Sequence, residues 1–156
     1  MNVTETIFAL ALASNLHPKQ HIQYAIEQLR PHGLMQLSSI YEIPCRDGVG
    51  ADYYNAAALL SSHQSVAQIQ DLFKQLEQSC GRHRPSHDIS LDVDLIAWGA
   101  DLQQMQFNPK KLPLALDVKI PLYEIWQHAD LKHIAHHYPQ FSLADLGQSS
   151  FVAQPA

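Results

Sequence analysis

The chain has 156 residues, of which 46% are hydrophobic and 16% charged, a composition typical of a globular domain with one hydrophobic core. Its formal net charge is -5 and it has ten Lys and Arg residues, too few for binding along a nucleic-acid backbone. Cys45 and Cys80 form no CxxC pair and are too few for a disulfide framework, which favours a reducing compartment. We expect a single cytoplasmic domain over residues 1–156 that does not bind nucleic acid.

Membrane association is not expected either. No apolar run approaches the roughly 20 residues of a spanning helix. The segment IFALALAS (7–14) has the apolar and small residues of a signal peptide, but Glu5 precedes it where a signal peptide carries Lys or Arg. We therefore expect this segment to belong to the folded domain.

The first half of the chain alternates between strand and helix patterns. Residues 6–13 are apolar on both faces, as in a central strand that is covered from two sides. Residues 17–33 place apolar residues at helical spacing after an early proline and end in a glycine. Residues 34–43 predict a second strand, which Pro44 ends, and residues 53–60 predict a third strand after the loop CRDGVGAD.

The second helix has the clearest boundaries. Ser65 and Gln68 fit a capping box at its start, and Gly81 occupies the position of a C-terminal stop. The buried stripe expected for this helix is Val66, Ile69, Leu72, Phe73 and Leu76. A polar loop then leads to the strand SLDVDLIAWG (90–99). The order β-α-β-β-α-β predicts a ferredoxin-like arrangement of the α+β class.

Beyond Gly99 the patterns are weaker. Residues 102–107 predict a short strand, residues 108–117 an irregular segment, and residues 121–138 one or two short helices. The apolar residues expected to pack in these helices are Leu122, Ile125, Trp126, Leu131 and Ile134. The expected fold is thus a ferredoxin-like core with a C-terminal extension of a short strand and helices, followed by a loose tail.

The strand at 90–99 carries two acids in an apolar segment. Side chains alternate between the two faces of a strand, so Asp92 and Asp94 share one face with Ser90. The opposite face is expected to carry Ile89, Leu91, Val93, Leu95 and Ala97. Two carboxylates on one face repel each other unless a cation lies between them. A solvated face of an edge strand and a Mg²⁺ site completed by water and phosphate both fit this pattern.

Basic residues lie close to these acids in the predicted fold. Arg82 and Arg84 follow the second helix, and Glu77 lies on its last turn. The planar guanidinium group of arginine binds two phosphate oxygens at once. Guanidinium groups beside a metal-binding acid pair suit phosphoryl transfer, where catalysis is mostly positioning and charge neutralisation. The alternative is that the arginines complement the dipole at the helix end.

Several stretches occur together in the order and spacing of a known enzyme family. They are ALASNL (11–16), SSIYEIP (38–44), YYNAAALL (53–60), LEQSCGRHR (76–84) with SLDVDLIAWG (90–99), and PLYEI (121–125). Over roughly residues 7–126 the chain resembles 6-hydroxymethyl-7,8-dihydropterin pyrophosphokinase, the folate-pathway enzyme that moves pyrophosphate from ATP to a pterin alcohol. The resemblance implies ATP and the pterin as partners, and we expect a monomer or weak homodimer.

The resemblance also implies roles for the charged residues. Asp92 and Asp94 would hold two Mg²⁺ ions that bridge the ATP phosphates, and Arg82 would stabilise charge in the transferring group. Arg84 and Glu77 would lie on the nucleotide side together with Arg82.

On the pterin side, the resemblance implies contacts from backbone groups and two side chains. The backbone groups lie around Ile43, Pro44 and Cys45, and the side chains are the aromatic ring of Tyr53 and the amide of Asn55. An amide suits the mixed edge of a pterin ring because it both donates and accepts hydrogen bonds.

The chain departs from the family pattern at several cationic and aromatic positions. The loop PSHDIS (85–90) lacks the family's Trp-Gly-Pro-Arg-Thr run, and Ile89 and Ser90 stand at its Arg and Thr. Ala115 and Asp117 stand at the positions of the family's Arg-x-Phe. The lysines that would replace part of the lost charge are Lys110, Lys111 and Lys119.

The lost cations bear on catalysis. Each lost contact to a transferring phosphate costs on the order of 3 kcal/mol, so we expect a pyrophosphokinase with reduced activity. The alternative is a catalytically impaired or repurposed paralogue that binds a pterin-like ligand or a protein partner.

The stretch HIAHH (133–137) offers a second metal hypothesis. His133, His136 and His137 stand at i, i+3 and i+4, so a helix would gather them on one side as transition-metal ligands. Asp130 is the only acid nearby that could orient them. A solvated helical face is the favoured interpretation.

Overall fold

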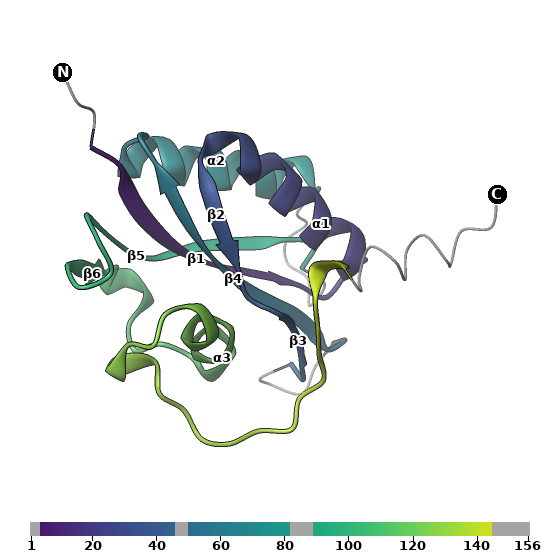
Figure 1. Cartoon of the computed structure of the whole chain (residues 1–156). Coiled ribbons are helices and arrows are strands. Elements are labelled where there is room, and N and C mark those ends of the chain that lie inside the picture. Colours follow the sequence, from purple (N-terminus) through teal and green to yellow (C-terminus); the bar gives the residue numbers. More distant parts are fainter. Residues whose placement is uncertain (1–3, 46–49, 82–88, 145–156) are drawn as a thin grey trace.

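The computed structural model describes residues 4–45, 50–81 and 89–144, whose core is an antiparallel sheet with helices on both faces (Figure 1). The strands run in the order β6-β5-β1-β4-β3-β7, and β2 pairs with β4 as β3 does. Helices α1 and α2 cover one face of the sheet, and α3 packs on the other (Figure 1). This arrangement confirms the α+β class.

The bounds of the elements are as follows. The strands are β1 (Thr6–Ser14), β2 (Leu34–Leu37), β3 (Ile40–Ile43), β4 (Tyr53–Ser62), β5 (Asp92–Gly99), β6 (Met105–Phe107) and β7 (Gln140–Phe141). The α-helices are α1 (Pro18–Leu29), α2 (Val66–Ser79) and α3 (Leu116–Ile125). Short 3-10 helices are η1 (Arg30–His32), η2 (Pro109–Lys111) and η3 (Ala129–Leu131).

Strand β1 is apolar throughout because each of its faces meets a helical layer. Phe8, Leu10 and Leu12 pack in the cluster that contains the buried stripes of α1 and α2. Ala9 and Ala11 lie in the cluster that contains α3. The prediction of a central strand covered from two sides is confirmed.

The boundaries predicted for α2 are also confirmed. The Ser65 hydroxyl accepts a hydrogen bond from the Gln68 backbone N–H at 3.1 Å, and the Gln68 side chain accepts one from the Ser65 backbone N–H at 2.9 Å. Gly81 follows the helix with φ +69°, a left-handed conformation that favours glycine. Ile69, Phe73 and Leu76 are buried, and Val66 and Leu72 are partly buried against the same core.

The single strand predicted over residues 34–43 is wrong in one respect, because it is divided into β2 and β3. Leu37 pairs with Ala58 and Tyr41 pairs with Asn55, so four steps on this side span three steps of β4. This extra residue is a β-bulge. Ser38, between β2 and β3, stays hydrogen-bonded to β4. Its backbone N–H donates to Ala57 O at 2.9 Å, and its hydroxyl accepts from Ala57 N–H at 2.8 Å.

A second bulge lies in β5 and corrects the predicted alternation. Ala9 pairs with Ala97 while Leu10 pairs with Leu95, so Ile96 is the extra residue. Leu95 therefore packs toward α1 and α2, whereas Ala97 joins the α3 cluster and does not share the face of Leu95. A prediction that assumes strict alternation of side chains along a strand does not anticipate an inserted residue.

Helix α3 begins at Leu116, within the segment predicted to be irregular, and not at Pro121. Proline is disfavoured in the interior of a helix because it lacks a backbone N–H and its ring crowds the preceding turn. Here Ile120, Pro121, Leu122 and Ile125 are all buried, and this packing outweighs the missing hydrogen bond. Asp117 lies in the first turn, where an acid favours the helix dipole.

The helix predicted over HIAHH is wrong, because residues 132–139 are neither helix nor strand. The chain there runs toward β7, which pairs with β3 at the edge of the sheet, and Glu42 N–H donates to Pro139 O at 2.9 Å. Ile134 was expected to pack but is 76% exposed. The described residues contain no group of three His, Cys, Asp or Glu side chains placed to hold a metal ion.

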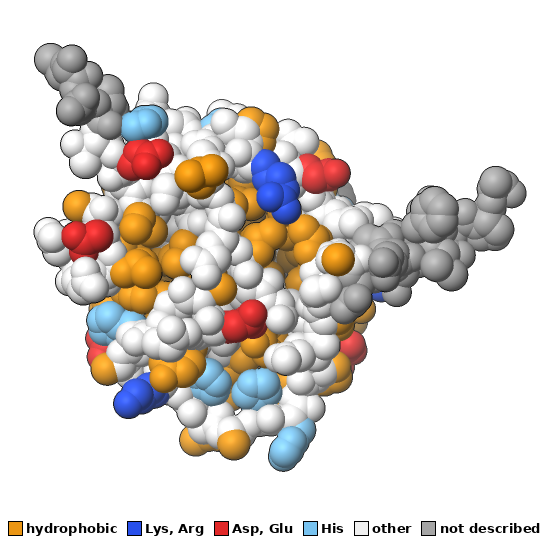
Figure 2. All heavy atoms as spheres, viewed as in Figure 1, with side chains coloured by type: hydrophobic (Ala, Val, Ile, Leu, Met, Phe, Trp, Pro, Cys, Tyr) orange, Lys and Arg blue, Asp and Glu red, His pale blue; other side chains and the backbone are white. Residues whose placement is uncertain are grey.

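The distribution of basic side chains on the surface is consistent with the low content of Lys and Arg. On the face shown in Figure 2, Lys and Arg side chains are scattered among apolar and neutral ones, and they form no continuous basic area. Histidines gather at the lower edge of this view, where Figure 1 places the chain between α3 and β7. Across the described part of the chain, every helix is too short or too polar to cross a bilayer.

Candidate functional site

Asp92 and Asp94 lie between two cavities. The first has a volume of about 540 Å³ and the second of about 340 Å³, and both aspartates line both of them. They reach this position because they alternate on β5, where they pair with Ala13 and Ala11 of the central strand. A cation held by these acids would thus contact ligands in both cavities.

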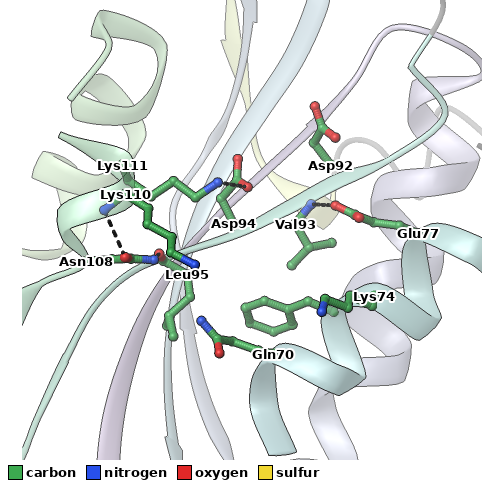
Figure 3. A pocket seen from close by; sticks show the side chains of 11 residues that line it. Gln70, Lys74, Glu77, Asp92, Val93, Asp94, Leu95, Asn108, Lys110 and Lys111 are labelled. Atoms are coloured by element: carbon green, nitrogen blue, oxygen red, sulfur yellow. Dashed lines mark hydrogen bonds and ion pairs between the residues drawn. The ribbon is translucent and has the colours of Figure 1, made fainter. Parts of the chain in front are cut away.

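The first cavity is formed by α2, the start of β5 and the segment around η2 (Figure 3). Among the described residues, its charged lining consists of the two aspartates with Glu77, Lys74, Lys110 and Lys111. The lysines come from two separate elements, α2 and η2, so cationic residues line this cavity on two sides. A polyanionic ligand is the chemistry that this lining suits.

Lys111 and Asp94 form an ion pair inside this cavity. The Lys111 ammonium donates to Asp94 Oδ1 at 2.8 Å, and each side chain is 38% exposed (Figure 3). This pair was not predicted from the sequence, where Lys111 was one of three lysines expected to replace part of the lost charge. The pair shows that a cation reaches the Asp94 carboxylate from the cavity.

Asn108 fixes the segment that carries Lys110 and Lys111. Its backbone N–H donates to Ile96 O at 2.7 Å, and its side-chain amide donates to Leu95 O at 2.9 Å. Its Oδ1 accepts from Lys110 N–H at 3.2 Å and so caps η2 (Figure 3). The carbonyls that it binds lie at the β5 bulge. The dipeptide Asn-Pro at 108–109 is the sequence signal for this turn.

Glu77 joins α2 to β5 at the acid pair. Its Oε2 accepts a hydrogen bond from the Val93 backbone N–H at 2.9 Å, and Val93 is the residue between the two aspartates (Figure 3). The family resemblance implied a nucleotide-side position for Glu77, and in the structure Glu77 lines the first cavity. The Glu77 carboxylate thus also connects α2 to β5.

The second cavity contains three of the residues predicted for the pterin. Cys45, Tyr53 and Asn55 line it together with the end of β1 and the first turn of α3. The chain reaches Cys45 through Ile43, which is buried at the end of β3, and Pro44, which is exposed. Asp117 also lines this cavity, although no role was predicted for its carboxylate.

Asn55 is the buried polar group of this cavity. It is 4% exposed, and its amide nitrogen donates to Tyr53 O at 3.3 Å. No donor to its Oδ1 is found among residues 4–45, 50–81 and 89–144. Because buried polar atoms normally have hydrogen-bond partners, this amide is suited to a ligand that both donates and accepts.

Asn15 positions the chain that enters β5. Its Oδ1 accepts from Ile89 N–H at 2.6 Å, and its backbone N–H donates to Ile89 O at 3.0 Å. Its amide nitrogen donates to Ala51 O at 3.4 Å. The stretch ALASNL thus links two segments near the second cavity, a role that its composition did not reveal.

Two predicted residues, Arg82 and Arg84, lie outside the described residues. The structure brings the others together around β5, with Glu77 in the first cavity and the pterin candidates in or near the second. Carboxylate oxygens are the ligands that Mg²⁺ prefers, and the ammonium at Asp94 occupies the place of a cation. The donor set therefore fits a magnesium ion.

Paired acids beside a lysine-lined cavity suit an enzyme that transfers a phosphate-containing group. Residues 9–138 match the family 7,8-dihydro-6-hydroxymethylpterin-pyrophosphokinase (HPPK). The match covers most of the 156 residues, and the chain therefore belongs to the HPPK family. Enzymes of this family transfer pyrophosphate from ATP to hydroxymethyldihydropterin in folate synthesis. No curated protein sequence matches the chain.

Proposed function

We propose that this chain transfers pyrophosphate from ATP to the hydroxymethyl group of 6-hydroxymethyl-7,8-dihydropterin. The observation that carries the proposal is the position of Asp92 and Asp94, which line both cavities at once. Transfer between two ligands needs their reacting groups to meet at one point, and the acid pair marks that point.

The linings of the two cavities differ in charge and polarity, as the two substrates do. The first contains the lysines and Glu77 and is assigned to ATP, together with Arg82 and Arg84. The second, at about 340 Å³, lies within the usual range of small-molecule sites and offers the buried amide of Asn55 and the ring of Tyr53 to the pterin. Cys45 and the backbone that precedes it complete this assignment.

In this proposal Asp92 and Asp94 hold two Mg²⁺ ions, which supply charge neutralisation for the ATP phosphates. The pterin hydroxyl oxygen forms a bond to the β-phosphorus of ATP, and the bond from this phosphorus to the α-β bridging oxygen breaks. AMP leaves with the electron pair of that bond, and the hydroxyl proton passes to solvent or to a neighbouring base. The protein residues orient the two substrates for this in-line displacement.

The departures from the family pattern predict slow turnover. Ile89 stands where the family has an arginine, and its backbone is bound to Asn15 at the entry to β5. Ala115 stands at the second arginine position and serves as the N-terminal cap of α3. Neither side chain supplies charge to a phosphate.

We also assign the core to the ferredoxin-like arrangement. The antiparallel order β5-β1-β4 with β2 and β3 beside β4 supports this assignment, as does the placement of α1 and α2 on one face.

Product analysis tests the reaction type. ³¹P NMR of the protein with ATP, Mg²⁺ and the hydroxymethylpterin should show AMP and a pterin diphosphate ester forming in equal amounts. Both products should be lost when either Mg²⁺ or the pterin is omitted. Formation of ADP or inorganic phosphate without the ester would contradict the proposal, and pterin binding without any product would favour the non-catalytic alternative.

A further inference from the structure

Lys111 is the described cation that contacts the acid pair, and its place is fixed by the chain around it. Its backbone N–H donates to Asn108 O at 3.0 Å, within the 3-10 turn that Asn108 anchors to the β5 bulge. The base of the side chain is therefore held, while the ammonium lies in the first cavity on Asp94 Oδ1. A lysine in this position has a fixed backbone, a flexible side-chain stem and a partly exposed charge.

The partner of this ammonium is also a proposed ligand of a divalent cation. An ammonium and a magnesium ion repel each other, so they compete for the same carboxylate. When a divalent cation takes Asp94, the Lys111 ammonium needs another anion within reach of its flexible stem. The polyphosphate of a nucleotide in the first cavity is the anion that the proposed function places there.

We propose that Lys111 is a phosphate-positioning residue that exchanges partners. Its ammonium binds Asp94 before the nucleotide arrives. When the metal ion occupies the aspartates, the ammonium moves to the ATP phosphates and binds them instead. This inference rests on the proposed function and adds to it a role for the Lys111 ammonium. Of the three lysines considered from the sequence, Lys110 and Lys111 line the cavity and only Lys111 contacts an acid there, within the described residues.

The exchange predicts two effects of opposite sign in Lys111→Met. Affinity for α,β-methylene-ATP with Mg²⁺, measured by calorimetry, should fall on the order of tenfold, because a charged hydrogen bond to phosphate is lost. Affinity for Mn²⁺ without nucleotide, measured by electron paramagnetic resonance, should rise several-fold, because the competing ammonium is gone. Lys111→Arg should retain most of the nucleotide affinity, and affinity for AMP should change little in either variant.

Lys132→Met serves as the matched control, since Lys132 is exposed and is absent from the linings of both cavities. Circular dichroism with thermal melting shows whether each variant is folded. Unchanged affinity for the ATP analogue in folded Lys111→Met, or an equal loss for the analogue and AMP, would overturn the inference. Failure of the wild-type protein to bind the analogue at all would instead overturn the proposed function on which it rests.

Discussion

The Glu77 carboxylate accepts a hydrogen bond from the Val93 backbone N–H at 2.9 Å, midway between the two aspartates of β5. A helix side chain thus holds the strand at the one residue whose neighbours on both sides are the candidate metal ligands. This contact joins the acid pair to α2, which forms another wall of the first cavity.

Glu77→Ala should therefore lower both stability and nucleotide affinity. We expect the free energy of unfolding to fall by about 1.5 to 3 kcal/mol, the range for a hydrogen bond to a charged group. Glu77→Gln keeps an oxygen acceptor and should lose less. Urea denaturation measures both variants, and Gln78→Ala, at an exposed site on the same helix, is the control. Equal stability of Glu77→Ala and wild type would show that the contact contributes nothing.

Cys45 reports on the second cavity without any need for turnover. It lines the proposed pterin site, and the hydroxymethylpterin should slow its alkylation by iodoacetamide severalfold. Cys80 lies against the core at the end of α2, and burial raises the pKa of its thiol, which slows its reaction. Mass spectrometry distinguishes the two sites. Protection of Cys80 alone, or of neither thiol at saturating pterin, would place the ligand elsewhere.

A hydrogen bond between Tyr41 and Glu124 connects β3 to α3. The Tyr41 hydroxyl donates to Glu124 Oε1 at 2.6 Å, and burial together with the Glu124 charge raises the pKa of Tyr41 well above its ordinary value. Tyr41→Phe should cost about 1.5 to 3 kcal/mol in the free energy of unfolding. Tyr24→Phe on α1 should change it by less than about 0.5 kcal/mol. Similar effects of the two substitutions, measured by urea denaturation, would contradict the role of the hydroxyl.

His136 should make stability depend on pH in a defined direction. Burial, and then the charges of His133 and His137, lower the pKa of His136 below 6.5, while its ring packs against Tyr41 and Tyr138. Below pH 6.5 the unfolded chain therefore binds more protons at this residue than the folded one, and stability falls as pH decreases until the folded pKa is passed.

The measurement is the melting temperature of wild type and His136→Phe at pH 7.5 and 5.5. The variant should lose less on acidification than the wild type, because it lacks the group that takes up the proton. A wild type and His136→Phe that lose the same number of degrees would refute the linkage.

Elements whose boundaries are set by local chemistry were predictable from the sequence. The Ser65–Gln68 capping box and Gly81 define α2 through contacts within a few residues, and the structure has both. The shared face of Asp92 and Asp94 was also predictable, because alternation along β5 holds up to Leu95.

The errors arose where distant contacts decide the structure. The bulge at Ile96 depends on Asn108 binding the carbonyls of Leu95 and Ile96, and nothing near Ile96 in the sequence signals it. The helix expected over HIAHH is replaced by a segment that is neither helix nor strand and that leads into β7, which pairs with β3. The Lys111–Asp94 pair has the same origin, since it joins two segments through the turn that Asn108 fixes.

The most direct test of the central claim is the rate of AMP release in Asp92→Asn and Asp94→Asn. The assay contains saturating ATP, Mg²⁺ and hydroxymethylpterin, and Asp71→Asn, at an exposed position on α2, is the charge-matched control. Each site variant should lose about 100-fold or more, by comparison with the loss of one preorganised electrostatic group elsewhere, while the control keeps the wild-type rate. An active wild type whose rate is matched by both site variants would contradict the assignment of the acid pair.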